Sequence, residues 1–140
     1  MPDASLIEEW IGLGPHKVLE KIDDAAIAIR RDGLIAYANE ATMTRFGYSR
    51  PQMIGQPVSM LLPEDRRAMH ADYIALWFKH PRARPMGKER NIQGRNASGE
   101  LMDLDIKLSP LETDLGVMAL ALVRERGKPL EIEHDLLPRP

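Results

Sequence analysis

The chain has 140 residues, of which 44% are hydrophobic and 29% charged, and its formal net charge is −2 at pH 7. This length suits one domain with a single hydrophobic core, and the charge balance lacks the basic footprint of a nucleic-acid-binding protein. The chain has no cysteine, which excludes disulfides, thiolate nucleophiles and cysteine zinc sites. No apolar run reaches the length of a membrane span. We therefore expect a globular cytoplasmic protein that contacts neither nucleic acid nor membrane.

Residues 1–17 are predicted to form an N-terminal helical extension. Leu6, Trp10 and Leu13 follow an i, i+4, i+7 spacing that creates one apolar stripe, and Gly14-Pro15 then interrupts the pattern. Because this stripe would be exposed on an isolated domain, we expect it to pack on a partner subunit or on the sheet, and to form a homodimer. Residues 126–140 hold three prolines and several charges, which is typical of a linker or tail.

Residues 18–125 carry the folded body. A turn at Arg31-Asp32-Gly33 separates two short apolar runs and predicts a β-hairpin. Asn39 and Ser49 are expected to cap two short helices, and the longest helix is expected after Pro63. The expected strands are 25–30, 34–38, 90–95, 101–111 and 117–124. The expected helices are 40–46, a second short helix that follows Ser49 and includes residue 51, and 64–79. This order predicts an α+β domain, with a five-stranded antiparallel sheet and helices over one face.

One helix face and the strand after it provide the main candidate site. His70, Tyr73, Ile74 and Trp77 fall at i, i+3, i+4 and i+7, so we expect the imidazole to point inward and burial to keep it neutral. Arg90 is expected on the following strand, where it would reach the same pocket from the opposite side. A buried guanidinium without a carboxylate is costly, which favours an anionic or polarised ligand beside it.

Two simpler interpretations remain open for this pair. His70 could hydrogen-bond a backbone carbonyl without any cofactor. Arg90 could pair with a carboxylate of its own hairpin; the candidates are Glu89, Asp103 and Asp105. Ser59 and Ser109 have no base nearby in the sequence pattern, so we expect no hydrolase triad and no catalytic site.

Several short segments in fixed order resemble a PAS sensory domain. They are Asp32-Gly33, Tyr37-Ala38-Asn39-Glu40-Ala41, Phe46-Gly47-Tyr48, Ile54-Gly55-Gln56, Leu61-Leu62-Pro63 and Gly99. The resemblance implies a cupped antiparallel sheet whose concave side is closed by the long helix and holds a small molecule or simply packs. Domains of this family sense signals or dimerise, and they usually serve a separate output domain.

A narrower resemblance lies between residues 70 and 108. The run His70-Ala71-Asp72-Tyr73-Ile74, followed by Gly87, Arg90, Gly94 and Gly99, is similar to the heme-binding PAS domains of FixL-type oxygen sensors and Dos-type phosphodiesterases. This resemblance implies that heme b is the cofactor, that His70 is the proximal iron ligand and that Arg90 hydrogen-bonds bound oxygen. It also places Ile106 and Leu108 against the distal face of the heme.

The sequence departs from both heme-binding patterns. Leu76 stands where FixL-type domains have a propionate-binding arginine, and Lys88 stands where Dos-type domains have a distal methionine. Met86, two residues before Lys88, is a candidate substitute, and Arg84 is a candidate propionate contact together with Lys79 and Arg82. A heme-free PAS module for dimerisation or small-metabolite sensing is therefore the alternative. The lack of cysteine disfavours light-sensing flavin and coumaric-acid domains.

Overall fold

A computed structural model of the chain describes residues 15–86 and 92–126. The expected helix before Gly14, the side chain of Arg90 and the tail after Arg126 lie outside these described residues. In chain order the elements are α2 (Pro15–Glu20), β1 (Ala25–Ile29), β2 (Ile35–Ala38), α3 (Glu40–Phe46), α4 (Arg50–Met53), the 3₁₀ helices η1 (Val58–Leu61) and η2 (Glu64–Arg66), α5 (Arg67–Lys79), β3 (Arg84–Met86), β4 (Ile92–Arg95), β5 (Leu101–Thr113) and β6 (Gly116–Glu125).

The strands form one antiparallel sheet in the order β2-β1-β6-β5-β3, and β4 also pairs with β5. Both β3 and β4 lie along the same edge of β5, so the sheet is five strands wide and its last position is shared by two short strands. The longest ladder joins β5 to β6, from Leu104 opposite Glu125 to Thr113 opposite Gly116. The predicted α+β fold with a five-stranded antiparallel sheet is thereby confirmed.

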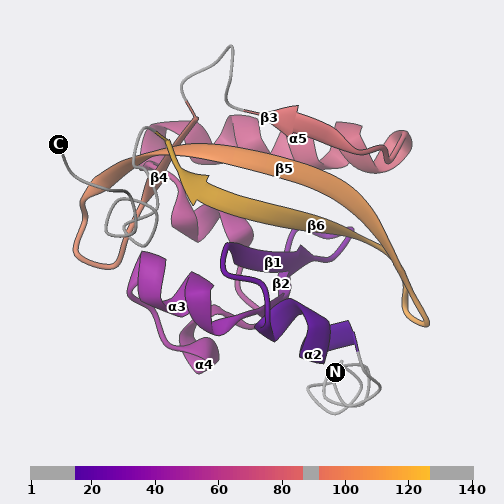
Figure 1. Ribbon diagram of the computed structural model, residues 1–140. Helices are drawn as coiled ribbons and strands as arrows, with labels where there is room; N and C mark the ends of the chain where they lie inside the picture. Colours follow the sequence, from indigo (N-terminus) through magenta and orange to yellow (C-terminus); the bar gives the residue numbers. More distant parts are fainter. Residues whose placement is uncertain (1–14, 87–91, 127–140) are drawn as a thin grey trace, which may run out of the picture.

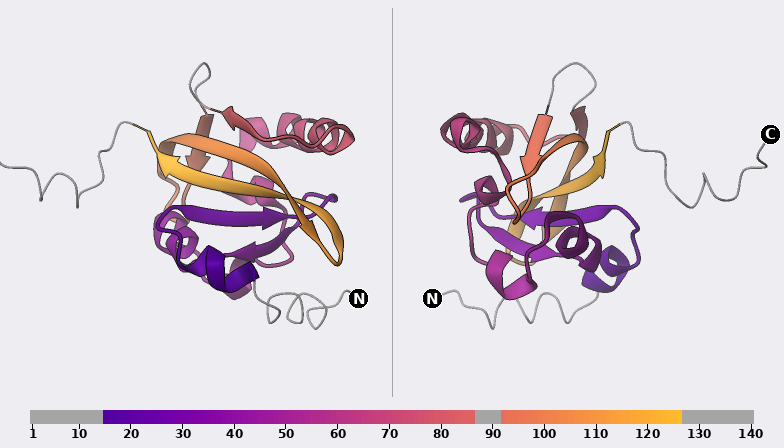
Figure 2. Two further views of the ribbon diagram at one scale, coloured as in Figure 1. Left: turned by 45° about the vertical axis from the view of Figure 1, so that its right-hand side comes forward. Right: turned by 90° about the vertical axis from the view of Figure 1, so that its left-hand side faces the viewer.

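Side-chain alternation along the strands separates two apolar clusters. One face of the sheet contributes Leu104 and Ala121 to the main core, which also contains Phe46, Trp77 and Phe78 from the helices. The opposite face carries a second cluster, which includes Leu19 from α2, Ile22 from the segment after it, and Met118, Leu120 and Leu122 from β6. Figure 1 shows α3 beside β1, and α5 beside β3 and β5. In the views of Figure 2, α5 and α2 lie at opposite ends of the domain.

The local signals for helix ends are largely confirmed. The Asn39 side chain caps α3 by accepting a hydrogen bond from the Thr42 amide, and Gly47 ends the helix with φ of 80°. The longest helix starts later than predicted, because Glu64–Arg66 forms a 3₁₀ turn in which the Arg66 amide bonds the Pro63 carbonyl at 3.0 Å. The α-helix itself therefore covers Arg67–Lys79.

Helix α2 is tied to the body by polar contacts. Glu20 accepts hydrogen bonds from the Tyr37 hydroxyl and, at 2.5 Å, from the Arg50 guanidinium. Burial and the neighbouring Glu20 raise the pKa of Tyr37 above its usual range, so its hydroxyl stays protonated as a donor.

Among residues 15–86 and 92–126, no helix is long and apolar enough to cross a membrane.

Candidate functional site

Helix α5 presents its inward face differently from the sequence-based expectation. Trp77 and Phe78 are buried, at 8% and 4% exposure, and Ile74 packs against the same core. Tyr73 is 47% exposed and lies on the outer face with Met69 and Leu76. The prediction that Tyr73 shares the inward face is therefore wrong. Burial of Phe78 turns the inward direction of the helix towards Ile74 and away from Tyr73.

The His70 imidazole is partly buried near the start of α5. Its Nδ1 atom is buried and has no hydrogen-bond partner among the residues that the structure describes. Burial also lowers the pKa of this imidazole, so the neutral form dominates near pH 7. An unsatisfied buried polar atom costs about 1–3 kcal/mol. The backbone-carbonyl partner considered for His70 is therefore not found at Nδ1 within the described part of the chain.

Four of the predicted site residues share one apolar wall. Ile74 and Trp77 from α5 pack in the main core together with Ile106 and Leu108 from β5. Alternation along β5 places Ile106 and Leu108 on the same face of the sheet. Trp77 is held in place because its ring packs edge-on against Phe78, with centroids 5.0 Å apart, and its Nε1 donates to the Arg82 carbonyl at 3.1 Å.

The backbone of β3 brings two further predicted positions beside this wall. Met86 pairs with Ile106, and Arg84 pairs with Leu108. Arg90 lies outside the described residues. Two of the carboxylates considered as its partners already have other contacts, which the sequence could not show. Asp105 pairs with Arg126 at 3.1 Å, and Asp103 accepts a hydrogen bond from Gln93 at 3.3 Å.

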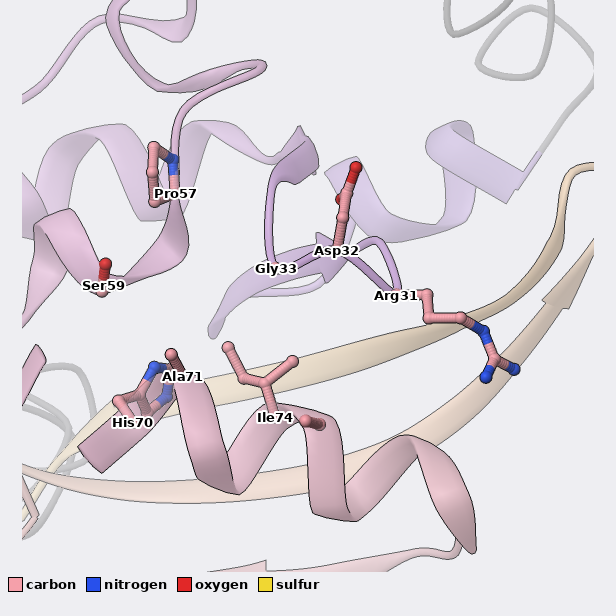
Figure 3. A pocket seen from close by; sticks show the side chains of 9 residues that line it. Arg31, Asp32, Gly33, Pro57, Ser59, His70, Ala71 and Ile74 are labelled. Atoms are coloured by element: carbon pink, nitrogen blue, oxygen red, sulfur yellow. The ribbon is translucent and has the colours of Figure 1, made fainter. Parts of the chain in front are cut away.

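A pocket of about 210 Å³ opens beside His70 (Figure 3). Its lining comes from α5, from the segment around η1 and from the β1–β2 turn, and consists of Arg31, Asp32, Gly33, Pro57, Ser59, His70, Ala71, Ile74 and Ala75. The sequence does not indicate a functional role for Ser59, because no base lies near it along the chain. Only the fold brings Ser59 and Asp32 to the same pocket as His70.

A serine, a histidine and an aspartate in one pocket do not make a triad here. In a triad the carboxylate accepts a hydrogen bond from Nδ1 of the histidine, whereas Nδ1 of His70 has no partner among the described residues. The Asp32 carboxylate instead binds Arg30 at 2.6 Å and accepts a bond from the Leu34 amide at 3.2 Å. The arrangement suits binding, and it lacks the connected proton path of a hydrolase.

The donor set of the site also restricts the kind of metal it can hold. Within the described ranges, no group of three or more His, Cys, Asp or Glu side chains could hold a metal ion. A metal at His70 would therefore need to carry most of its own ligands, as iron in a porphyrin does. A neutral imidazole with an apolar wall nearby fits that kind of group.

The buried imidazole predicts how stability depends on pH. The folded chain holds His70 with a pKa below the ordinary 6.5, so the unfolded chain binds this proton at higher pH and holds more protons in the interval between the two values. The free energy of unfolding should therefore fall as the pH drops from about 7 into the range below 6.5. Urea denaturation across this range should show the decrease. His70→Gln should remove this component, and the exposed His80→Gln should retain it.

An antiparallel sheet with helices packed against its inner face, and with a partly buried imidazole on the longest of them, defines an α+β domain with the architecture of a sensory module. The family model described as PAS fold matches residues 15–116. The chain belongs to the PAS family and is a PAS sensory domain.

Relatives among characterised proteins agree with this membership. The chain is 30% identical over 131 residues to the oxygen sensor protein DosP of Escherichia coli (strain K12), a match that covers 87% of this chain and 16% of DosP. It is 28% identical over 98 residues to the sensor protein FixL of Bradyrhizobium diazoefficiens, covering 70% of this chain and 19% of FixL. The chain thus spans less than one fifth of either relative.

Solved structures share the fold at lower identity. A PAS domain from a two-component sensor histidine kinase superimposes with a TM-score of 0.64 at 20% identity, covering 87% of this chain and 99% of that one. The LOV protein of Rhodobacter sphaeroides gives a TM-score of 0.69 at 19% identity, covering 94% of this chain and 73% of that one.

Proposed function

We propose that this PAS domain senses a gas through heme b, with His70 as the protein ligand to the iron. The observation that carries the proposal is the His70 imidazole itself, which is neutral, partly buried and without a partner at Nδ1 among the described residues. The relatives named oxygen sensor protein DosP and sensor protein FixL support it. The domain would pass its state to an output domain of a larger regulatory protein.

Each remaining residue has a role that follows from its position. Ile74 and Trp77 would cover the porphyrin on the side of α5, and Ile106 and Leu108 would exclude water on the side of the sheet. Heme, when bound, supplies an iron that binds small gases reversibly. Arg90 would supply a guanidinium donor to a gas bound at the heme. A hydrogen bond from a charged donor is worth about 1.5–3 kcal/mol. Arg84 and Met86, next to Leu108 and Ile106 in the β3–β5 ladder, would complete its edge.

Hemin titration tests the proposal directly. Adding hemin to the purified chain should produce a sharp Soret band that saturates at about one equivalent, because one imidazole provides the protein ligand. The broad spectrum of free hemin at every ratio would contradict heme binding. The family membership rests on the fold and would be unaffected.

The second proposal concerns assembly, and its motivation is the apolar face of the sheet opposite the main core. We propose that the Leu6, Trp10 and Leu13 stripe contributes to a homodimer close to the cluster formed by Leu19, Met118 and Leu122. Removing residues 1–13 should convert a dimer to a monomer in light scattering. An unchanged oligomeric state, together with an unchanged free energy of unfolding, would contradict this proposal.

A further inference from the structure

The pocket beside His70 shares Ile74 with the apolar wall described for the heme and otherwise lies apart from it. Figure 3 shows His70, Ala71 and Ile74 of α5 on one side, Pro57 and Ser59 on another, and the turn at Asp32 and Gly33 on a third. Trp77, Ile106 and Leu108 do not line it. Its volume of about 210 Å³ corresponds to roughly seven water molecules at about 30 Å³ each. It can therefore hold a molecule of roughly seven to ten non-hydrogen atoms.

Glycine at position 33 allows the turn to approach the helix closely. Its φ is +85°, a conformation that other residues rarely adopt, and a Cβ built there would lie 3.6 Å from Cδ1 of Ile74. The turn and α5 therefore face each other at short range and form two opposite walls of the pocket.

The charged side chains at the rim of the pocket make contacts away from its interior. The Asp32 carboxylate pairs with Arg30 at 2.6 Å. The Arg31 guanidinium lies over the ring of Phe78, 5.4 Å from its centroid, and Figure 3 shows this side chain directed away from the pocket. A charged ligand would lose hydration here without meeting a counter-charge directed into the pocket. The pocket therefore favours an uncharged occupant.

The remaining groups define the chemistry of that occupant. Apolar atoms come from Pro57, Ala71, Ile74 and Ala75, while Ser59 and His70 supply polar groups. A serine hydroxyl and a neutral imidazole can each donate or accept a hydrogen bond. We infer that this pocket binds a small uncharged molecule with an apolar body and a hydroxyl group, such as a phenol or a small alcohol. The pocket shares His70 and Ile74 with the proposed heme site, and its other lining residues lie outside that site.

Phenol is a suitable probe, because it has seven non-hydrogen atoms, one hydroxyl and no charge near neutral pH. Titration of the ¹⁵N-labelled, heme-free chain should shift the amide signals of Gly33, Ser59, Ala71 and Ile74 with a saturable curve. Benzoate, a charged molecule with a similar body, should bind at least about tenfold more weakly, since its carboxylate finds no counter-charge. Ser59→Ala should weaken phenol binding by about two- to tenfold, the equivalent of one hydrogen bond.

Two substitutions on α5 form a matched pair. Ala71→Leu fills the pocket from an exposed helix position and should abolish the saturable shifts. Ala68→Leu, also exposed on α5 but outside the pocket lining, should leave phenol binding unchanged. Phenol binding that survives in Ala71→Leu, is lost equally in Ala68→Leu or is matched by benzoate would overturn the inference. Absence of saturable shifts in the wild-type chain would overturn it as well. The hemin titration is read separately by the Soret band, so the failure of one proposal does not imply the failure of the other.

Discussion

Replacing Asn39 with leucine is expected to lower the free energy of unfolding by about 3 kcal/mol or more. Asn39 is fully buried, and its Oδ1 accepts hydrogen bonds from the Ala26 amide at 2.9 Å and the Thr42 amide at 3.0 Å. Its Nδ2 donates to the carbonyls of Leu19 at 2.9 Å and Asp24 at 3.0 Å. A leucine leaves these buried backbone groups unsatisfied, at about 1–3 kcal/mol for each group that water cannot reach.

Urea denaturation of the wild-type chain and two variants measures this effect. Asn39→Asp keeps the acceptor but sets a buried carboxylate oxygen against the carbonyls that Nδ2 served, so at pH 7 it should destabilise the fold at least as much as Asn39→Leu. Asn96→Ala is the matched control, because the Asn96 side chain also bonds nearby amides, those of Ser98 and Glu100, but in a solvent-accessible hairpin turn. Water can replace those bonds, so the cost should be about 1 kcal/mol. Equal losses for Asn39→Leu and Asn96→Ala would contradict the role given to burial.

The consequence reaches beyond one helix cap. Through Asn39, the end of α2, the segment before β1 and the start of α3 share a single side chain. The Asp24–Arg124 pair, at 3.0 Å, joins the same segment to the end of β6. The N-terminal and C-terminal ends of the domain are therefore held together, and loss of the Asn39 side chain should destabilise both. Hydrogen exchange of the amides in β1 and β6 would show this loosening as faster exchange.

Local signals in the sequence were sufficient for much of the fold. Gly33 adopts positive φ in the turn expected at Arg31-Asp32-Gly33, because this signal depends only on its immediate neighbours. Ile106 and Leu108 both pack against the main core, since strand alternation gives them a common face of β5. The orientation of Tyr73 was wrong for a related reason. Helical spacing shows which residues share a face of the helix, but it does not show which part of that face points to the core. The burial of Phe78 sets that direction and leaves Tyr73 outside it.

The candidate site was harder to predict, because its parts are distant in the chain. Asp32, Ser59 and His70 line one pocket only because the β1–β2 turn, η1 and α5 pack together. Their separation carries no periodic signal, and the Asp32-Gly33 pair could be interpreted only as a turn. Whether Nδ1 of His70 has a partner likewise depends on side chains from several elements. The sequence could therefore propose His70 as a ligand but could not describe its surroundings.

His70→Ala is expected to abolish the sharp Soret band of the hemin-loaded chain. His70 is the one protein ligand proposed for the iron, so this substitution removes that ligand. Free imidazole added in excess should restore the band, because it can enter the space vacated by the side chain and supply the same nitrogen. Absorption spectra of wild-type, His70→Ala and imidazole-treated His70→Ala chains, each with hemin, provide the measurement.

The exposed His80, which follows α5, separates coordination from general effects of losing a histidine. His80→Ala should keep the wild-type spectrum and stoichiometry. If His70→Ala also keeps them, the iron ligand is another residue and the assignment carried over from the heme-binding domains is wrong. If His70→Ala loses the band but imidazole fails to restore it while far-ultraviolet circular dichroism is unchanged, the imidazole shapes the cavity without ligating the iron. Only loss of the band with rescue supports ligation, because rescue requires that the missing function be the imidazole nitrogen itself.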